Sequence, residues 1–117
     1  MNLLVTIPKR EYKNDDKETQ ALLNEPGSFQ FWAMNRTPKK LNIGDRVYFV
    51  RDSRIESSMR VVDIKESRLN KFAITEDCCV TGGRWKGNCI LYMDDLRMEN
   101  IPGKIKGFRG FRYYEGS

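Results

Sequence analysis

The feature that most constrains the fold is a series of short apolar runs separated by turn-forming residues. The runs are rich in β-branched and aromatic side chains, and Pro, Gly, Asn or Asp lies between most of them. Runs that recur every ~10–15 residues are typical of a small, strongly bent sheet or barrel. The strands that this pattern predicts are 2–7, 29–35, 46–50, 59–64, 72–75, 79–81 and 88–93.

One helix is expected between the first two runs. Asp15 or Asp16 is suited to cap it, and residues 21–23 (Ala-Leu-Leu) supply its apolar side. Residues 25–28 (Glu-Pro-Gly-Ser) then end the helix. The sequence therefore predicts an α+β, mainly β fold: a small bent sheet or pseudobarrel of about five to six strands with one or two short helices.

Length and composition favour a single domain spanning residues 1–117, since 39% of the 117 residues are hydrophobic and 32% are charged. No apolar run approaches the ~20 residues that cross a bilayer. The apolar start at residues 3–5 is too short for a signal peptide and is soon followed by Pro8. We therefore expect a soluble, cytoplasmic protein without a membrane partner.

The absence of histidine excludes several kinds of active site. Without it, a Ser-His or Cys-His nucleophile pair cannot form within one chain, and the commonest zinc ligand is missing. The three cysteines, Cys78, Cys79 and Cys89, fit neither a disulfide framework nor a Cys-x-x-Cys metal site. They are expected to be reduced, partly buried apolar residues, and no metal or other cofactor is expected.

The net charge of +5 is concentrated in two segments. Residues 31–60 hold seven basic and three acidic side chains, and residues 104–117 hold four basic and one acidic side chain. The remaining stretches, 1–30 and 61–103, each carry a net charge of −1. Clustered cations are what a polyanion-binding face requires, because phosphates are bound by releasing counterions. A solvated basic surface that aids solubility explains the same charge.

Three segments combine cations with aromatic side chains, the composition of a single-strand nucleic-acid site. Aromatic rings stack on bases, amides read base edges, and Arg or Lys binds phosphate. The alternative in each case is structural, with the aromatic ring in the core and the cations solvated. The candidate nucleic-acid-binding residues are Trp32, Asn35, Arg36, Lys39 and Lys40 in the first segment, Arg84 and Trp85 in the second, and Lys104, Lys106, Arg109, Arg112 and Tyr113 in the third.

Residues 41–64 carry a more specific pattern. Leu41-Asn42-Ile43-Gly44-Asp45 leads into the run 46–50, and the run 59–64 follows about ten residues later. Glycine relieves the turn and the aspartate accepts backbone N–H bonds. This arrangement resembles the PUA-like superfamily, which includes PUA, ASCH, EVE and YTH domains. In that family the Gly-Asp turn opens a central barrel strand, and the next strand closes a hairpin across it. Ser57-Ser58 stands where members often carry a small glycine motif.

The resemblance implies binding of nucleic acid, commonly RNA or a modified base, in a basic, aromatic-lined cleft. The leading hypothesis is thus a non-catalytic module for RNA or DNA that accommodates a modified or extruded base. A second hypothesis is a small ASCH-like nucleoside or RNA hydrolase. Such an enzyme would use a Lys-Glu or Lys-Asp pair, for which Glu56, Glu66 and Lys39 or Lys40 are candidates. A third is a phage or mobile-element adaptor that binds a host protein. Of the three hypotheses, the enzyme is not the favoured one, and no catalytic residue is assigned.

Overall fold

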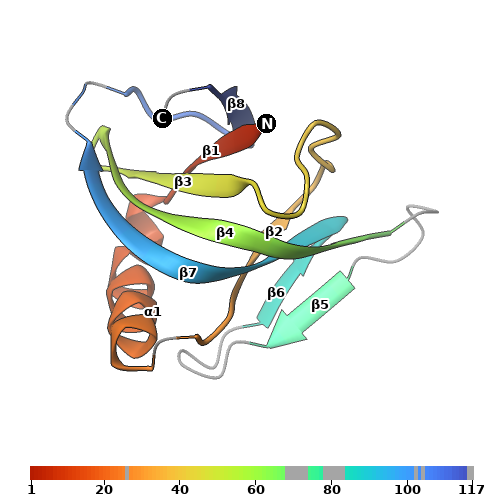
Figure 1. Cartoon of the computed structure of the whole chain (residues 1–117), viewed down its shortest axis with the longest axis horizontal. Coiled ribbons are helices and arrows are strands. Elements are labelled where there is room, and N and C mark those ends of the chain that lie inside the picture. The colour runs from red at the N-terminus through yellow and green to blue at the C-terminus, as the bar shows by residue number, and fades with distance from the viewer. Residues whose placement is uncertain (26, 68–73, 78–83, 102, 104, 116–117) are drawn as a thin grey trace.

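The computed structural model describes residues 1–25, 27–67, 74–77, 84–101, 103 and 105–115 (Figure 1). Among these residues strands dominate, and α-helix occurs once, directly after a short 3-10 turn. The elements run in the order β1 (Asn2–Thr6), η1 (Lys9–Glu11), α1 (Tyr12–Asn24), β2 (Gln30–Met34), β3 (Arg46–Arg51), β4 (Arg54–Glu66), β5 (Ile74–Asp77), β6 (Arg84–Gly87), β7 (Cys89–Ile101) and β8 (Phe111–Tyr114).

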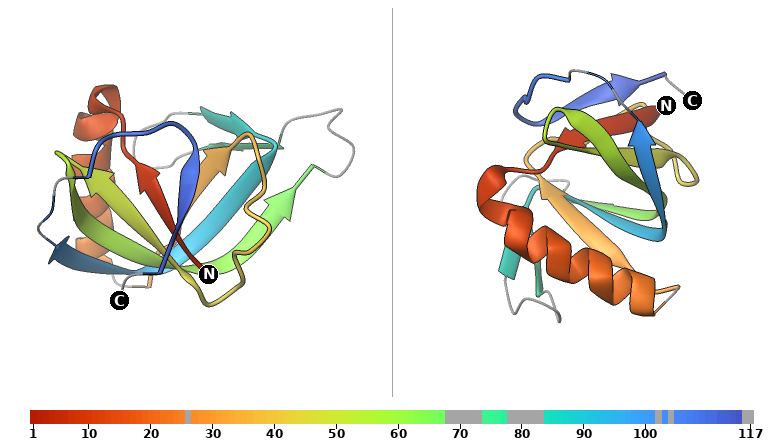
Figure 2. Two further views of the ribbon diagram at one scale, coloured as in Figure 1. Left: turned by 90° about the horizontal axis from the view of Figure 1, so that it is seen from above. Right: turned by 90° about the vertical axis from the view of Figure 1, so that its left-hand side faces the viewer.

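Six strands form one sheet in the order β2-β7-β4-β3-β1-β8. The sheet curls into a half-barrel, and α1 lies against its inner side (Figures 1 and 2). Strands β5 and β6 form a separate antiparallel pair, with β6 next to β2. The predicted fold class, α+β and mainly β with a small bent sheet, is confirmed.

Alternation along the strands separates two core clusters, because successive side chains of a strand point to opposite faces. In β1, Leu3 and Val5 belong to the larger cluster and Leu4 to the smaller one. The larger cluster also holds Ile7, Met34, Leu41, Val47, Phe49, Met59, Val61, Cys89, Leu91 and Met93. The smaller cluster is completed by Tyr48, Val50 and Ile55, and is covered by Ile101, Ile105, Phe108 and Tyr114 from the C-terminal segment.

The turn before β3 has the predicted chemistry. Gly44 has a φ of 98°, in the region that favours glycine. The carboxylate of Asp45 accepts a hydrogen bond from the backbone N–H of Asn42 at 2.8 Å. The turn therefore delivers β3 into the sheet, where it pairs antiparallel with β4.

Two strands are longer than the apolar runs predicted at 59–64 and 88–93, since β4 and β7 each span 13 residues. The additional residues are largely polar but include Ile55 of the smaller core cluster, and contacts across the strands hold them in place. Arg60 of β4 donates to the Asp94 carboxylate of β7 at 2.9 and 3.0 Å. Ser58 is fully buried, and its hydroxyl donates to a carboxylate of β7. Opposite charges on neighbouring strands stabilise pairing beyond the apolar centre of each strand.

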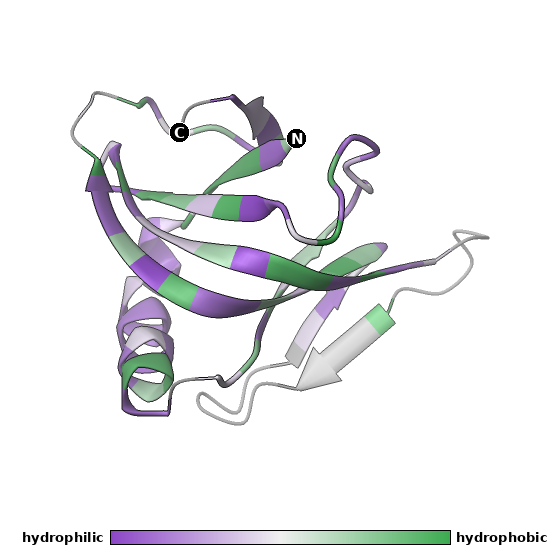
Figure 3. Ribbon diagram, viewed as in Figure 1, coloured by the Kyte–Doolittle hydropathy of each residue, from purple (hydrophilic) through white to green (hydrophobic). Residues whose placement is uncertain are grey.

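Helix α1 is mostly polar, with its hydrophobic residues at the C-terminal end (Figure 3). It begins at Tyr12 without a side-chain cap, so the prediction that Asp15 or Asp16 caps it is wrong. Leu22 packs against the larger core, while Leu23 is 51% exposed. No helix among the described residues is long and apolar enough to cross a membrane.

Glycine at position 87 allows β6 to lie against β2. A Cβ atom built on Gly87 would lie 2.7 Å from the backbone oxygen and 2.9 Å from the backbone nitrogen of Met34. Real Cβ atoms do not approach backbone this closely, so any larger residue would push the two strands apart. This contact positions Trp85, which lies two residues earlier on β6, beside the inner side of the half-barrel.

Candidate nucleic-acid interface

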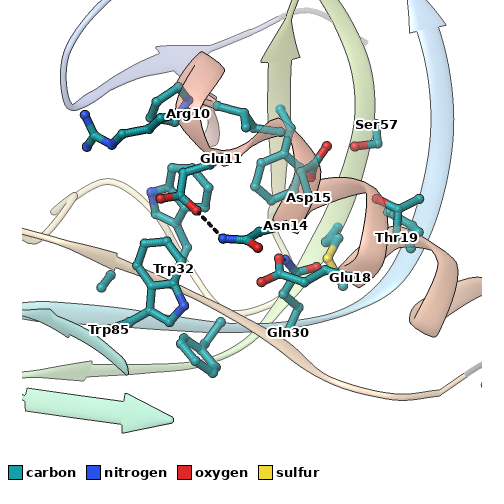
Figure 4. A pocket seen from close by; sticks show the side chains of 17 residues that line it. Arg10, Glu11, Asn14, Asp15, Glu18, Thr19, Gln30, Trp32, Ser57 and Trp85 are labelled. Atoms are coloured by element: carbon teal, nitrogen blue, oxygen red, sulfur yellow. Dashed lines mark hydrogen bonds between the residues drawn. The ribbon is translucent and has the colours of Figure 1, made fainter. Parts of the chain in front are cut away.

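A cavity of about 210 Å³ lies between α1 and the sheet (Figure 4). Trp32 and Trp85 form part of its wall, together with Phe49 and Met59 of the core. The Trp32 ring packs on Phe49 at a centroid distance of 5.6 Å, and Trp32 is only partly buried. Trp32 therefore contacts the core and also lines an open space.

The helix side of this cavity is polar. Glu11, Asn14, Asp15, Glu18 and Thr19 line it, and their spacing of three and four residues places them on one face of the helix. A helix packed on a sheet normally presents an apolar stripe at this spacing. Here polar side chains occupy the inward face, so the helix and the sheet enclose a space instead of closing into a dry core.

Side-chain hydrogen bonds orient the polar groups of the cavity. The amide of Asn14 donates to the carboxylate of Glu11 at 3.1 Å (Figure 4). The amide of Gln30, on β2, donates to the carboxylate of Glu18 and so links the sheet to the helix. Each amide therefore directs an N–H toward a carboxylate.

Arg51 at the end of β3 fastens the first turns of α1 to the sheet. Its guanidinium donates to Asp15 at 2.8 Å and to Asp16 at 2.6 Å, and it lies 4.2 Å from the ring centroid of Tyr12. The carboxylate of Glu56, on β4, lies 3.7 Å from the Arg51 guanidinium. Burial raises the pKa of Asp15 and of Glu56, and the charge of Arg51 opposes both shifts.

A second, more open hollow adjoins the cavity and is strongly basic. Four cations line this groove, and the described residues that line it include no carboxylate. Four aromatic rings line it as well. Trp32 and Trp85 border both spaces, so the groove opens beside the cavity. The cations of the groove are Arg10, Arg36, Lys86 and Arg109, and its aromatic residues are Trp32, Trp85, Phe108 and Phe111.

A third hollow extends the groove around the loop between β2 and β3. It shares Asn35, Arg36 and Phe111 with the groove and adds Lys39, Lys40, Glu66 and Tyr113. The guanidinium of Arg36 lies 5.3 Å from the Phe111 ring centroid, and the ammonium of Lys40 lies 5.7 Å from that of Tyr113. The Tyr113 hydroxyl accepts a hydrogen bond from the backbone N–H of Lys40 at 3.0 Å. These contacts hold the C-terminal segment against the loop.

Most of the predicted binding residues lie around these hollows. The groove brings together Trp32, Asn35, Arg36, Trp85 and Arg109, and the third hollow holds Lys39, Lys40 and Tyr113. Arg112 is exposed and stacks over Phe108 at 4.5 Å, and Lys106 is exposed and lines neither hollow. Residue 84 belongs to β6, and Lys104 lies outside the described residues.

The sequence did not predict the polar residues of α1 as part of a site, nor Arg10 as part of the groove. Of the three cysteines, Cys89 is buried and free, while Cys78 and Cys79 lie outside the described residues. In the part of the chain that the structure describes, no three metal-ligating side chains are grouped as a metal site.

No family model, no curated protein and no solved structure matches this chain.

Proposed function

We propose that this protein is a nucleic-acid-binding module that holds a single-stranded segment of RNA or DNA in the basic groove. The observation that carries the proposal is the combination of four cations and four aromatic rings, without a carboxylate, among the described residues of one groove. Proteins that bind single strands combine these same elements, a positive channel for the backbone and aromatic platforms for the bases.

The adjoining cavity supports the further step that one base leaves the strand. Trp32 and Trp85 border both spaces, so a base that rotates out of the groove meets their rings first. Stacking on an aromatic side chain contributes about 1–3 kcal/mol per base. The phosphates would stay in the groove on Arg36 and Arg109. This arrangement agrees with the cleft that the PUA-like resemblance implies, and membership of that superfamily remains part of the proposal.

Binding of a short fluorescent single strand, measured by anisotropy across a range of salt concentrations, tests the proposal. Each neutralised phosphate of a single strand contributes about −0.7 to the slope of log K against log salt, so four cations predict a slope of about −3. RNA and DNA strands of the same sequence are compared directly. Absence of micromolar binding at low salt, or an affinity that does not change with salt, contradicts the proposal.

Variants assign the binding to the groove. Arg36→Ala removes a groove cation, and Arg54→Ala removes an equal charge from the exposed first residue of β4, outside the groove. We expect Arg36→Ala to weaken binding and reduce the salt slope by about 0.7, while Arg54→Ala leaves both nearly unchanged. Equal effects of the two substitutions would mean that overall charge, and not the groove, attracts the strand.

A second candidate function, hydrolysis of a modified nucleoside, is favoured by one specific observation. Lys39, Lys40 and Glu66 line the same hollow, although 26 residues separate Lys40 from Glu66 in the sequence. A lysine and a carboxylate in one cleft can act as a general acid–base pair. Incubation with N-acylated and other modified nucleosides, followed by mass spectrometry, detects such an activity. Turnover that Glu66→Gln abolishes supports it, and no turnover of any nucleoside excludes it for the compounds tried.

A further inference from the structure

The cavity beneath α1 has the opposite charge to the groove. Three carboxylates line the cavity, those of Glu11, Asp15 and Glu18. Among the described residues that line it, Arg10 is the only cation. Ionised carboxylates only accept hydrogen bonds. A group that enters the cavity therefore meets acceptors and negative charge, whereas a group in the groove meets cations.

The two amides of the cavity each offer a carbonyl acceptor and one remaining N–H donor. Asn14 uses one amide N–H on Glu11, and Gln30 uses one on Glu18. The opposite end of each amide is a carbonyl oxygen, which is a further acceptor. The hydroxyls of Thr19 and Ser57, which line the other end of the cavity in Figure 4, can donate or accept. The three carboxylates accept hydrogen bonds and donate none, so this part of the lining suits a ligand that donates hydrogen bonds.

The size of the cavity restricts the ligand to about one ring system. Its volume of about 210 Å³ corresponds to roughly seven water molecules at the ~30 Å³ that each occupies in the liquid. Pockets for drug-sized ligands measure about 300–1,000 Å³. Walls made of the Trp32 and Trp85 rings favour a planar group, because aromatic faces stack on flat rings and attract positive edges.

We infer that the cavity takes an extruded base that carries an exocyclic amino group, in preference to the same ring without that group. The inference rests on the proposed function, because the groove must deliver the base. The amino hydrogens would donate to the carboxylates of Glu11 or Asp15 while the ring contacts the two indoles. A carbonyl oxygen at the same position would face a carboxylate oxygen, and that contact is repulsive.

Matched bases at one position of a strand test the inference. The probes are a uracil strand, the same strand with one central cytosine, and two strands whose central base is guanine or hypoxanthine. Hypoxanthine is guanine without its 2-amino group. We expect the amino-bearing member of each pair to bind about tenfold more tightly and to quench tryptophan fluorescence more strongly. This is the discrimination that a lost hydrogen bond to a charged partner produces.

Two substitutions of equal charge assign the preference to the cavity. Glu11→Gln replaces a cavity carboxylate by an amide of the same shape, and Glu25→Gln changes an exposed carboxylate that follows α1. Glu11→Gln should reduce the preference for the amino-bearing base several-fold without changing the salt slope, and Glu25→Gln should change neither. Melting curves of both variants verify that they are folded.

The outcomes separate this inference from the proposed function. Strands that all bind equally, with a salt slope, overturn the inference and leave the groove as the binding site. If no strand binds, the proposed function fails, and free cytidine and uridine are titrated against tryptophan fluorescence instead. Stronger quenching by cytidine then supports the cavity preference, while equal quenching or none overturns it.

Discussion

Replacement of Arg51 by methionine should destabilise the protein by about 2–4 kcal/mol. The guanidinium is 14% exposed and contacts Asp15, which is 19% exposed, so this ion pair is largely removed from water. Breaking a fully buried pair costs about 3–5 kcal/mol, mainly because the remaining charge is left unpaired. The partial exposure of both groups lowers that figure, whereas the lost contact with the Tyr12 ring adds about 0.5–1 kcal/mol.

Thermal and denaturant melts of Arg51→Met and of Arg97→Met measure this effect. Arg97 also pairs with an aspartate, but it is 62% exposed, so its loss should cost under ~1 kcal/mol. Asp15→Asn added to Arg51→Met should recover part of the stability, because it removes the unpaired carboxylate. The reasoning is refuted if Arg51→Met is no less stable than Arg97→Met, or if Asp15→Asn gives no recovery.

The same variant has a defined pH dependence. Burial already raises the folded-state pKa of Asp15 and Glu56, and removal of Arg51 takes away the charge that opposes this rise. A carboxyl group whose pKa is raised on folding favours the folded state below its unfolded pKa, and this contribution is lost as the pH rises through the folded pKa. The deficit of Arg51→Met relative to the wild type should therefore shrink between pH 7 and about pH 4. A stability difference that grows between pH 7 and about pH 4 would contradict the conclusion that Arg51 stabilises the ionised carboxylates of Asp15 and Glu56.

Three further predictions follow from single contacts. Gly87→Ala should lower the free energy of unfolding by about 1–3 kcal/mol, because the alanine Cβ would lie 2.7 Å from the Met34 backbone oxygen. A lower melting temperature and a red shift of tryptophan emission are the expected measurements. Trp32→Ala should reduce single-strand affinity by about 1–3 kcal/mol while Trp32→Phe retains most of it, as measured by anisotropy. Arg109→Ala should reduce the salt slope by about 0.7, whereas Arg112→Ala should not, because only Arg109 lines the groove; equal slopes for the two would contradict this distinction.

The central strands could be predicted because their own residues determine them. The run 46–50 alternates between two core clusters and lies where the Gly-Asp turn predicts a strand. The extent of β7 could not be predicted in this way. Its extension beyond the apolar run begins at Asp94, which pairs with Arg60, 34 residues away in the sequence, only once the sheet has formed. Charged residues such as Asp94 and Asp95 are depleted in strands and give no local signal of one.

The groove was predictable in composition but not in arrangement. The sequence pattern makes Trp32, Arg36 and Arg109 candidate binding residues, yet nothing local brings residue 36 near residue 109. That proximity depends on β8, which pairs with β1, and on the contact of Arg36 with Phe111. Long-range strand pairing depends on the whole fold, so the sequence alone could not predict that side chains from the two basic segments line the same groove.

The acidic lining of the cavity corresponds to a pattern in the sequence, namely acidic residues at the period of a helix. Residues 21–23 predict an apolar side of the helix by composition, but adjacent residues of a helix do not share a face. Steps of four and three residues back from the partly buried Leu22 lead to Glu18, Asp15 and Glu11. The face that packs toward the core is thus acidic along most of its length. Such a stripe predicts a polar space beneath the helix.

The opposite charges of the groove and the cavity restrict which part of a nucleotide can enter each space. A phosphate in the cavity would face Glu11, Asp15 and Glu18 at short range, where low solvent access strengthens the repulsion. The same phosphate in the groove meets Arg36, Arg109 and two further cations. A base carries no charge and tolerates both environments, and an amino group on it gains from the carboxylates. Phosphate in the groove and base in the cavity is therefore the one orientation in which both halves of a nucleotide meet complementary groups.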